Sequence, residues 1–520
     1  MAEAGLRYPA RRRRRSRGLP RIGVGRLAAV LVLLTGLGMA ALLLTRPEHV
    51  DPRRALAEAR SALAAHRWSV ARDHALRAVA AEPGFGEAQA VLARAYLELG
   101  DGLAGEAALS RAQAAGIAPP RLHPWRAQAR LLQGDGDGAL AEAARTPAAL
   151  VDDADRIRAR TLAWQGRGGE AQSVLKALLG RSPRNAAAWT DIGRIRLTAG
   201  DVGGAADAAQ RAVALDGRDP AALTLQGEIV RTRYGPRAAL PWFAAATGRD
   251  PGYHPALIEQ AATLGELGRY GDMLAATRRA LAARPGSPQA LYLQAVLAAR
   301  AGRPALARSL LAHTGGAIDD APGVLLLGGA LDLAEGAPEA AVAKWRQLVD
   351  RQPYNPVARR LLGSALLRSG DAAGALIAIA PLADRGDNDA YTLELAARAL
   401  ASTGEAAGAV RLHDRAMAGR PGAAAVFRSS VGIGTLQADA AAAPGSPDRA
   451  LALMRGLAGS GATGRALAIA RRLEAVSPGA PAASLAEGDI LLTGGNPAGA
   501  ARAFARAANL RFDEPGMMRL

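Results

Sequence analysis

Glycine recurs every 34 residues through the middle of this 520-residue chain. A second column, seven places before the glycine, holds only glycine or alanine, and a third, five places after it, is alanine except at Met273. A fixed period of this length predicts stacked copies of one supersecondary unit, each of which buries its apolar face only against its neighbours. The glycine column runs through Gly166, Gly200, Gly268, Gly302, Gly336, Gly370 and Gly404, and it misses only at Tyr234.

Each column has a physical reason if the unit is a pair of helices. A small residue at the eighth place lets the first helix approach the second. Glycine at the fifteenth place ends the first helix in a left-handed conformation, and the acid that often follows suits the start of the second helix. Proline then ends the second helix before the next unit begins. These acids are Asp101, Asp135, Asp201, Asp371 and Glu405.

The repeated residues resemble the tetratricopeptide repeat family, whose pattern is W-x2-L-G-x2-Y, then A-x3-F, then a proline. The first half is matched by Trp189, Ile192 and Gly193, and the second half by Ala239, Phe243, Ala246 and Pro251. The resemblance implies an all-α fold, a right-handed α-solenoid of about thirteen 34-residue helix-turn-helix repeats. It also implies binding rather than catalysis. The predicted units start near positions 52, 86, 120, 152, 186, 220, 254, 288, 322, 356, 390, 447 and 481.

The amino end predicts a membrane anchor. Residues 1–26 are predicted to be an Arg-rich disordered tail; they hold nine arginines against Glu3, which gives +8 of the chain's net +18. Residues 27–45 are 19 uncharged, mostly apolar residues, long enough for a transmembrane helix in the lipid bilayer. Because arginines precede this segment, we expect the amino end in the cytoplasm and the repeats in the periplasm of a bacterium. A cleaved signal peptide is the alternative.

The rest of the chain divides at one break in the period. Residues 46–423 are predicted to form the main solenoid of about eleven repeats, and residues 447–513 two more, followed by a tail at 514–520. Residues 424–446 are out of phase and rich in glycine and proline where a helix should run. They are either a degenerate repeat acting as a flexible joint or a point where the superhelix changes direction.

No residue pattern predicts catalysis, a cofactor or a metal site. The chain has no cysteine, no paired metal-binding histidines and no nucleophile elbow. The G-x-G-x-x-G match at 459–464 and the acidic run at 134–138 both fall at predicted turns, so we interpret them as turns. The basic composition is almost entirely arginine and lacks interleaved aromatics, which does not favour nucleic acid as a partner.

The candidate site is the concave face of the solenoid, which in the family is lined by helix A at places 2, 5, 9, 12 and 13. A groove of guanidinium groups would bind the carboxylates of an acidic peptide or an anionic polysaccharide. The alternative is a solvated face in an arginine-rich chain. The ninth-place residues are Arg60, Arg94, Arg160, Arg194, Arg398 and Arg455; nearby places add Arg156, Arg231, Arg300, Arg360, Trp164, Tyr292 and Tyr391. Between 254 and 335 these places are more apolar, at Ile258, Leu326 and Leu333, which suits an apolar anchor from a partner chain.

These features together predict a non-enzymatic scaffold anchored by a single pass in the bacterial inner membrane. The resemblance implies that it binds other proteins or peptides in the cell envelope, in assembly or secretion of exopolysaccharide or surface proteins. One alternative is a tethered regulator of an envelope enzyme, of the kind that controls lipopolysaccharide synthesis. Another is a direct binder of an anionic polysaccharide in the concave groove.

Overall fold

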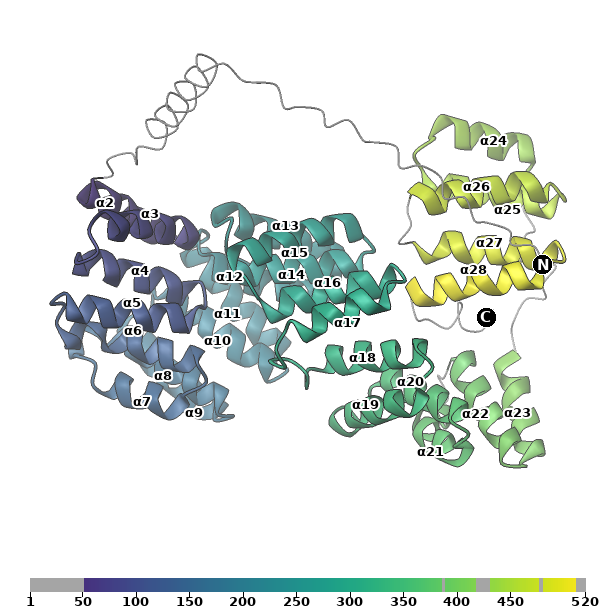
Figure 1. Ribbon diagram of the computed structural model, residues 1–520, viewed down its shortest axis with the longest axis horizontal. Helices are drawn as coiled ribbons and strands as arrows, with labels where there is room; N and C mark the ends of the chain where they lie inside the picture. Colours follow the sequence, from purple (N-terminus) through teal and green to yellow (C-terminus); the bar gives the residue numbers. More distant parts are fainter. Residues whose placement is uncertain (1–50, 386–388, 418–430, 477–479, 511–520) are drawn as a thin grey trace, which may run out of the picture.

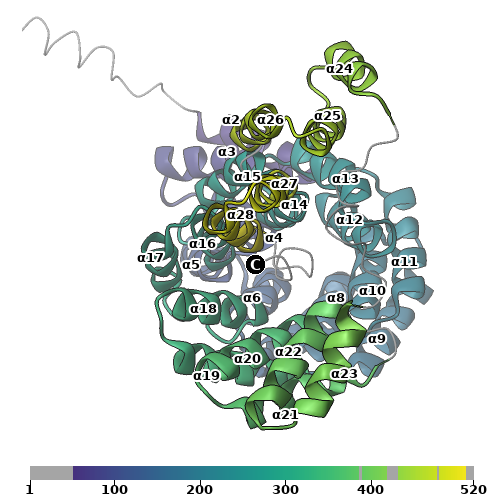
Figure 2. The ribbon, with the colours of Figure 1, turned by 90° about the vertical axis from the view of Figure 1, so that its right-hand side faces the viewer.

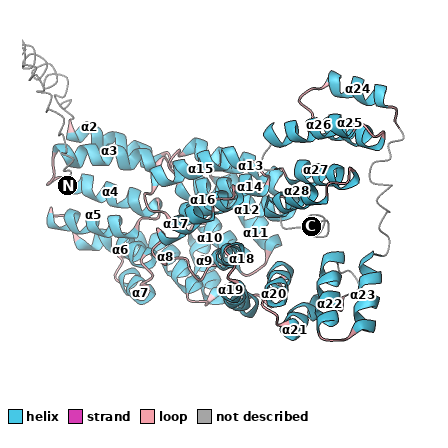
Figure 3. Cartoon of the chain, turned by 45° about the vertical axis from the view of Figure 1, so that its right-hand side comes forward, coloured by secondary structure: helices cyan, strands magenta, loops and turns pink. Residues whose placement is uncertain are grey.

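The computed structural model describes residues 51–385, 389–417, 431–476 and 480–510. Within these ranges the chain forms 27 α-helices and one short 3-10 helix, η1 (Ala148–Leu150), and it contains no strand (Figure 3). The predicted all-α repeat solenoid is confirmed. The helices are α2 (Pro52–Ala64), α3 (Trp68–Ala81), α4 (Gly86–Glu98), α5 (Gly102–Ala114), α6 (Pro119–Leu132), α7 (Gly136–Ala144), α8 (Val151–Trp164), α9 (Gly168–Arg181), α10 (Ala186–Thr198), α11 (Val202–Leu215), α12 (Pro220–Tyr234), α13 (Pro236–Arg249), α14 (His254–Glu266), α15 (Tyr270–Ala283), α16 (Pro288–Arg300), α17 (Pro304–Ala312), α18 (Pro322–Ala334), α19 (Pro338–Arg351), α20 (Pro356–Arg368), α21 (Ala372–Ala383), α22 (Ala390–Ser402), α23 (Ala406–Met417), α24 (Ile433–Ala442), α25 (Pro447–Gly459), α26 (Thr463–Val476), α27 (Pro481–Thr493) and α28 (Pro497–Leu510).

Each repeat is a hairpin of a first helix, helix A, and a second helix, helix B (Figure 1). From α2 to α23 the even-numbered helices are the A helices and the odd-numbered ones the B helices. Every A helix begins at its predicted start or one residue before it, including α25 and α27 beyond the break in the period. From α2 to α23 the hairpins stack so that the A helices surround a central axis and the B helices lie outside them (Figure 2).

Glycine ends helix A in the predicted left-handed conformation, as at Gly200, whose φ is 81°. The column misses at Tyr234 because α12 runs to that residue, and Gly235, with a φ of 85°, makes the turn one residue later. The first hairpin departs in another way. His66 occupies the glycine place with a φ of 54°, and it is the one non-glycine residue with positive φ in the described part of the chain.

The acid that follows the glycine caps helix B. Asp101 Oδ1 accepts a hydrogen bond from the backbone N–H of Ala104 at 2.9 Å, and Asp135 Oδ1 accepts one from Gly138 at 2.8 Å. Such a cap satisfies one of the free N–H groups at a helix start. The acidic run at 134–138 is therefore a capped turn, as we interpreted it from the sequence.

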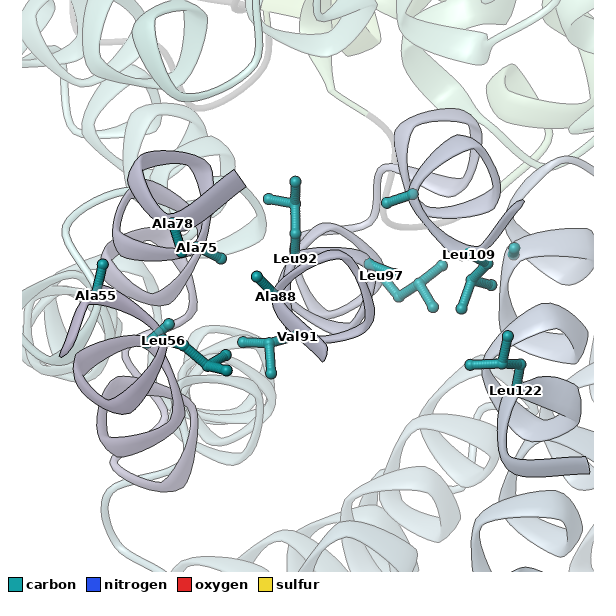
Figure 4. Close-up of a cluster of buried hydrophobic side chains, with 14 residues drawn as sticks. Ala55, Leu56, Ala75, Ala78, Ala88, Val91, Leu92, Leu97, Leu109 and Leu122 are labelled. Atoms are coloured by element: carbon teal, nitrogen blue, oxygen red, sulfur yellow. The ribbon is translucent and has the colours of Figure 1, made fainter. Parts of the chain in front are cut away.

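The core is a series of small contacts between helices, made largely of alanine and leucine. Figure 4 shows the first of these clusters, to which α2 to α6 contribute. Where the eighth place is glycine, an aromatic residue of helix B often fills the space. A β-carbon on Gly227 would lie 2.5 Å from Phe243 Cε1, and one on Gly329 would lie 2.4 Å from Trp345 Nε1. The small residues at the eighth place thus allow the close approach of helix A to helix B that the period predicts.

The break in the period contains one helix of its own. The predicted insertion 424–446 lies outside the described residues up to 430, and α24 covers 433–442. The turn after α24 has the hydrogen bond typical of the junction from helix B to the next helix A. Ser446 N donates to Ala443 O at 3.0 Å, as Tyr253 N donates to Asp250 O at 3.0 Å. By this turn, α24 holds the place of a helix B ahead of the last two repeats.

None of the helices in the described ranges is both long and apolar enough to cross a membrane. The predicted tail at 1–26, the anchor at 27–45 and the carboxyl tail at 514–520 lie outside the described residues.

Candidate partner-binding face

The A helices form the inner side of the superhelix, and five of the ten candidate arginines on them form ion pairs with an acid that lies on, or caps, a neighbouring A helix. Arg194 on α10 lies 3.2 Å from Glu228 on α12. Arg156 on α8 lies 2.8 Å from Asp191 on α10. The remaining pairs of this kind are Arg60 with Glu87, Arg231 with Glu259, and Arg360 with Asp389, the residue that caps α22.

These pairs form a ladder between successive repeats, in which each arginine reaches an acid about one repeat further along the chain. Partly exposed pairs of this type contribute about 0–1 kcal/mol each, so the ladder aligns the repeats more than it stabilises them. A guanidinium has five N–H donors, and one carboxylate occupies two at most. The side chain of Arg194 keeps 48% of its surface exposed, so it can still donate to a ligand.

One acid of this ladder, Glu259, has a shifted pKa because it is largely buried. Burial raises the pKa of the Glu259 carboxyl, and the charge of Arg231 opposes the rise. Arg231 also donates to Thr263 Oγ1 at 3.2 Å. This arginine is therefore committed to its neighbours more fully than Arg194 is.

Four of the candidate arginines make no ion pair with the described part of the chain: Arg94, Arg160, Arg455 and Arg300, which donates to the Tyr270 hydroxyl instead. Arg94 lies on α4 and is exposed, and Arg160 lies on α8 and is partly exposed. Trp164, at the end of α8, keeps 60% of its surface exposed. A free guanidinium and an open indole on one helix could bind a carboxylate and an apolar side chain of the same segment.

The two candidate tyrosines are more buried than an open groove would leave them. Tyr292 on α16 packs against α18, where a β-carbon on Gly323 would lie 2.4 Å from its hydroxyl oxygen. Tyr391 on α22 is buried. Arg300 stacks over the ring of Tyr270, 5.4 Å from its centroid, and donates to its hydroxyl at 2.8 Å. These side chains hold neighbouring repeats together.

A cavity of about 790 Å³ opens where the main array ends, between α20, α22 and α23. Tyr391 and Arg398 line it together with Glu394 and His413, which the sequence did not single out. Glu394 lies 2.9 Å from His413 Nδ1 and 3.1 Å from Arg398 Nε. Burial alone would raise the pKa of Glu394, but these two neighbours outweigh it and hold the pKa below its usual range.

The sequence indicates this cavity when equivalent positions of successive repeats are compared. His413 and Met417 occupy the places that Ile379 and Ala383 hold one repeat earlier. Ile379 and Ala383 are buried against α22. A polar residue at a place that is elsewhere buried indicates an end of the stack.

Comparison with known proteins identifies the repeats. Segments 158–222, 191–254, 258–314 and 328–390 match a family model described as tetratricopeptide repeat. The chain contains tetratricopeptide repeats. The matched segments include the ion pair between Arg194 and Glu228, so the ladder belongs to these tetratricopeptide repeats and not to an unrelated insertion.

Several solved structures resemble the chain at low identity. The crystal structure of PilW, a type IV pilus biogenesis factor, is 22% identical with a TM-score of 0.34, and the match covers 41% of this chain and 98% of that one. The Cut9–Hcn1 hetero-tetramer is 13% identical with a TM-score of 0.37, covering 93% and 97%. A human IFIT1 dimer is 14% identical with a TM-score of 0.42, covering 76% and 91%. At TM-scores below 0.5 these likenesses add nothing to the assignment of function. No curated protein matches the sequence at a significant level.

Proposed function

We propose that this tetratricopeptide repeat protein is a scaffold that binds an acidic segment of a partner protein along the inner face of its superhelix. The observation that supports this most is the set of guanidinium groups with donors to spare on the A helices, Arg94, Arg160 and Arg194. Charge-assisted hydrogen bonds to carboxylates are the strong interactions such groups make. A long curved face of this kind suits an extended segment.

The membrane setting is part of the same proposal. The 19 uncharged residues at 27–45 and the arginines before them support a single-pass anchor in the inner membrane of a bacterium, with the repeats in the periplasm. We place the scaffold in the cell envelope, in assembly or secretion of exopolysaccharide or surface proteins. A tethered regulator of an envelope enzyme is the alternative role. A reporter that works only in the cytoplasm can be fused after residue 520. Activity of this reporter would overturn the proposed topology.

A binding experiment tests the inner face directly. A fluorescent glutamate-rich peptide would be titrated with the full chain in detergent micelles, and anisotropy would be recorded at several salt concentrations. Arg94→Glu and Arg160→Glu should each weaken binding about tenfold, because about 1.4 kcal/mol of charge-assisted hydrogen bonding is lost. Binding to the wild type should weaken as salt screens the attraction.

The matched control is Arg278→Glu on α15, an outer helix, where the arginine is exposed and makes no ion pair with the described residues. It changes the net charge equally and should leave the affinity close to that of the wild type. Equal losses for inner and outer variants would contradict a specific inner site. If polygalacturonate competed with the peptide at the inner face while binding more tightly, the anionic-polysaccharide alternative would replace the protein partner.

A further inference from the structure

The first hairpin touches the array again after one superhelical turn, where α3 meets the turn that joins α13 to α14 (Figures 1 and 2). Trp68 at the start of α3 packs edge-on against Tyr253, with ring centroids 5.1 Å apart. Both rings belong to one buried cluster with Leu99, Leu223 and Ala246. We call this contact the first-turn seam, formed by Trp68, Ser69, Asp250, Gly252 and Tyr253.

At the seam, the carboxylate of Asp250 caps the start of α3, although it lies 181 residues from Ser69 in the sequence. The residue before α3, Arg67, makes no side-chain cap. Instead the backbone N–H of Ser69 donates to both carboxylate oxygens of Asp250, at 3.2 and 3.1 Å, and the Ser69 hydroxyl donates to the same group. Asp250 is fully buried. The free N–H groups and the helix dipole of α3 both favour a negative charge there.

The close approach of the two backbones makes the seam specific. The backbone N–H of Gly252 donates to Ser69 Oγ at 3.3 Å. A β-carbon on Gly252 would lie 2.6 Å from Ser69 Cβ, so no larger residue fits there without a shift. Arg72 reaches across as well, with Nη1 3.4 Å from the carbonyl oxygen of Ala283 at the end of α15.

His66 adds a strained residue to the same contact. It stands where other hairpins have glycine, and a histidine in the left-handed region costs about 1 kcal/mol or more. In return its Nε2 lies 2.8 Å from Asp216 Oδ2, beyond the end of α11, and its ring meets Trp68 edge-on. A side chain kept at a strained position because it reaches another repeat indicates that the contact has a use.

We propose that the hairpin α2–α3 is a latch that closes the first superhelical turn, with Asp250 as its catch, and that opening the latch widens access to the inner arginines. The hairpin is suited to move, because as the first repeat described it stacks on one neighbouring repeat only. Curvature in a solenoid is the sum of small rotations between repeats, so slight changes spread over six repeats open the seam. The effect on a partner rests on the proposed function; the latch itself does not.

Spin labels test the latch without any partner. The chain has no cysteine, so labels on Arg77→Cys in α3 and Arg278→Cys in α15 report one distance distribution across the seam in the full chain in detergent micelles. Asp250→Ala should broaden and lengthen that distribution. Asp250→Asn should keep it narrow, because the amide oxygen still accepts from the Ser69 N–H. The amides at the start of α3 should exchange with solvent about fivefold to thirtyfold faster in Asp250→Ala only.

Two further variants keep the test decisive. Asp201→Ala removes the N-cap of α11, where the capping residue directly precedes the helix. This variant should leave the distance between the two labels unchanged. His66→Gly fits the backbone of its turn better and so retains the hairpin, yet it loses the Asp216 contact and should also broaden the distribution. Narrow distributions in both Asp250→Ala and His66→Gly would overturn the latch. Because no partner is present, that result would leave the proposed binding function untouched.

Discussion

Replacing Gly227 with alanine should destabilise the sixth hairpin although alanine is the better helix former. A β-carbon at Gly227 would lie 2.5 Å from Cε1 and 2.8 Å from Cδ1 of Phe243, a fully buried ring that has no room to move. Overpacking of this kind costs about 1–3 kcal/mol. The substitution gains about 1 kcal/mol of helix propensity in return. The local free energy of opening of α12 and α13 should therefore fall by about 0–2 kcal/mol.

Native-state hydrogen exchange measures this quantity better than global melting, because a repeat array can open one part at a time. The control is Gly248→Ala in α13, where no atom lies within 4 Å of the new β-carbon. It should be neutral or stabilising by up to about 1 kcal/mol. The two variants should thus differ by about 1–3 kcal/mol, which is the overpacking cost itself.

A double-mutant cycle isolates the contact. Phe243→Leu removes the ring edge that the new β-carbon meets, so Gly227→Ala should cost less in that background, with a coupling of about 0.5–3 kcal/mol. If Gly227→Ala were as stabilising as Gly248→Ala, and independent of residue 243, the packing explanation of the small column would be refuted.

The remaining predictions concern polar side chains that are buried or partly buried. Burial, aided by the charge of Arg284, lowers the pKa of His254 to about 4, so the folded state keeps it neutral while the unfolded state gains a proton below about pH 6.5. The stability of α14 should fall by about 3 kcal/mol between pH 6.5 and 4, and His254→Gln should flatten this dependence in hydrogen exchange; a flat wild-type profile would contradict it. Arg308 and Lys344 contact the Asp332 carboxylate at 2.8 and 2.5 Å. Asp332→Ala should lower the free energy of unfolding in urea by about 1–3 kcal/mol, because two cations lose their buried partner. Asp101→Ala should destabilise α5 by about 0.5–2 kcal/mol by hydrogen exchange, and Asp101→Asn should preserve the cap, whereas equal losses would exclude a capping role.

The local structure was predictable because it depends on residues within each repeat. The start of each helix A, the left-handed glycines and the acids that cap helix B all depend on residues within one hairpin. The miss at Tyr234 is equally local, since Gly235 makes the same turn one residue later. Sequence therefore predicts the unit and its phase.

Contacts between distant repeats could not be predicted in the same way. A 34-residue period says nothing about how far each repeat rotates on the next, and this rotation decides that Ser69 meets Asp250. The ion pair of Arg194 with Glu228 depends on side-chain geometry that the column alone does not contain. The burial of Tyr391 has the same origin, because the face of helix A is shared between the groove and the neighbouring repeat.

The most direct test of the account is site-specific photocrosslinking of the full chain in intact cells. A photoreactive residue would replace Arg94 or Arg160 on the inner side, and Lys176 on α9 or Arg278 on α15 on the outer side. If the partner docks on the inside of the superhelix, one and the same protein should be captured from both inner positions and from neither outer position. Capture from the outer positions alone, or equally from all four, would contradict a docking face on the inside of the superhelix.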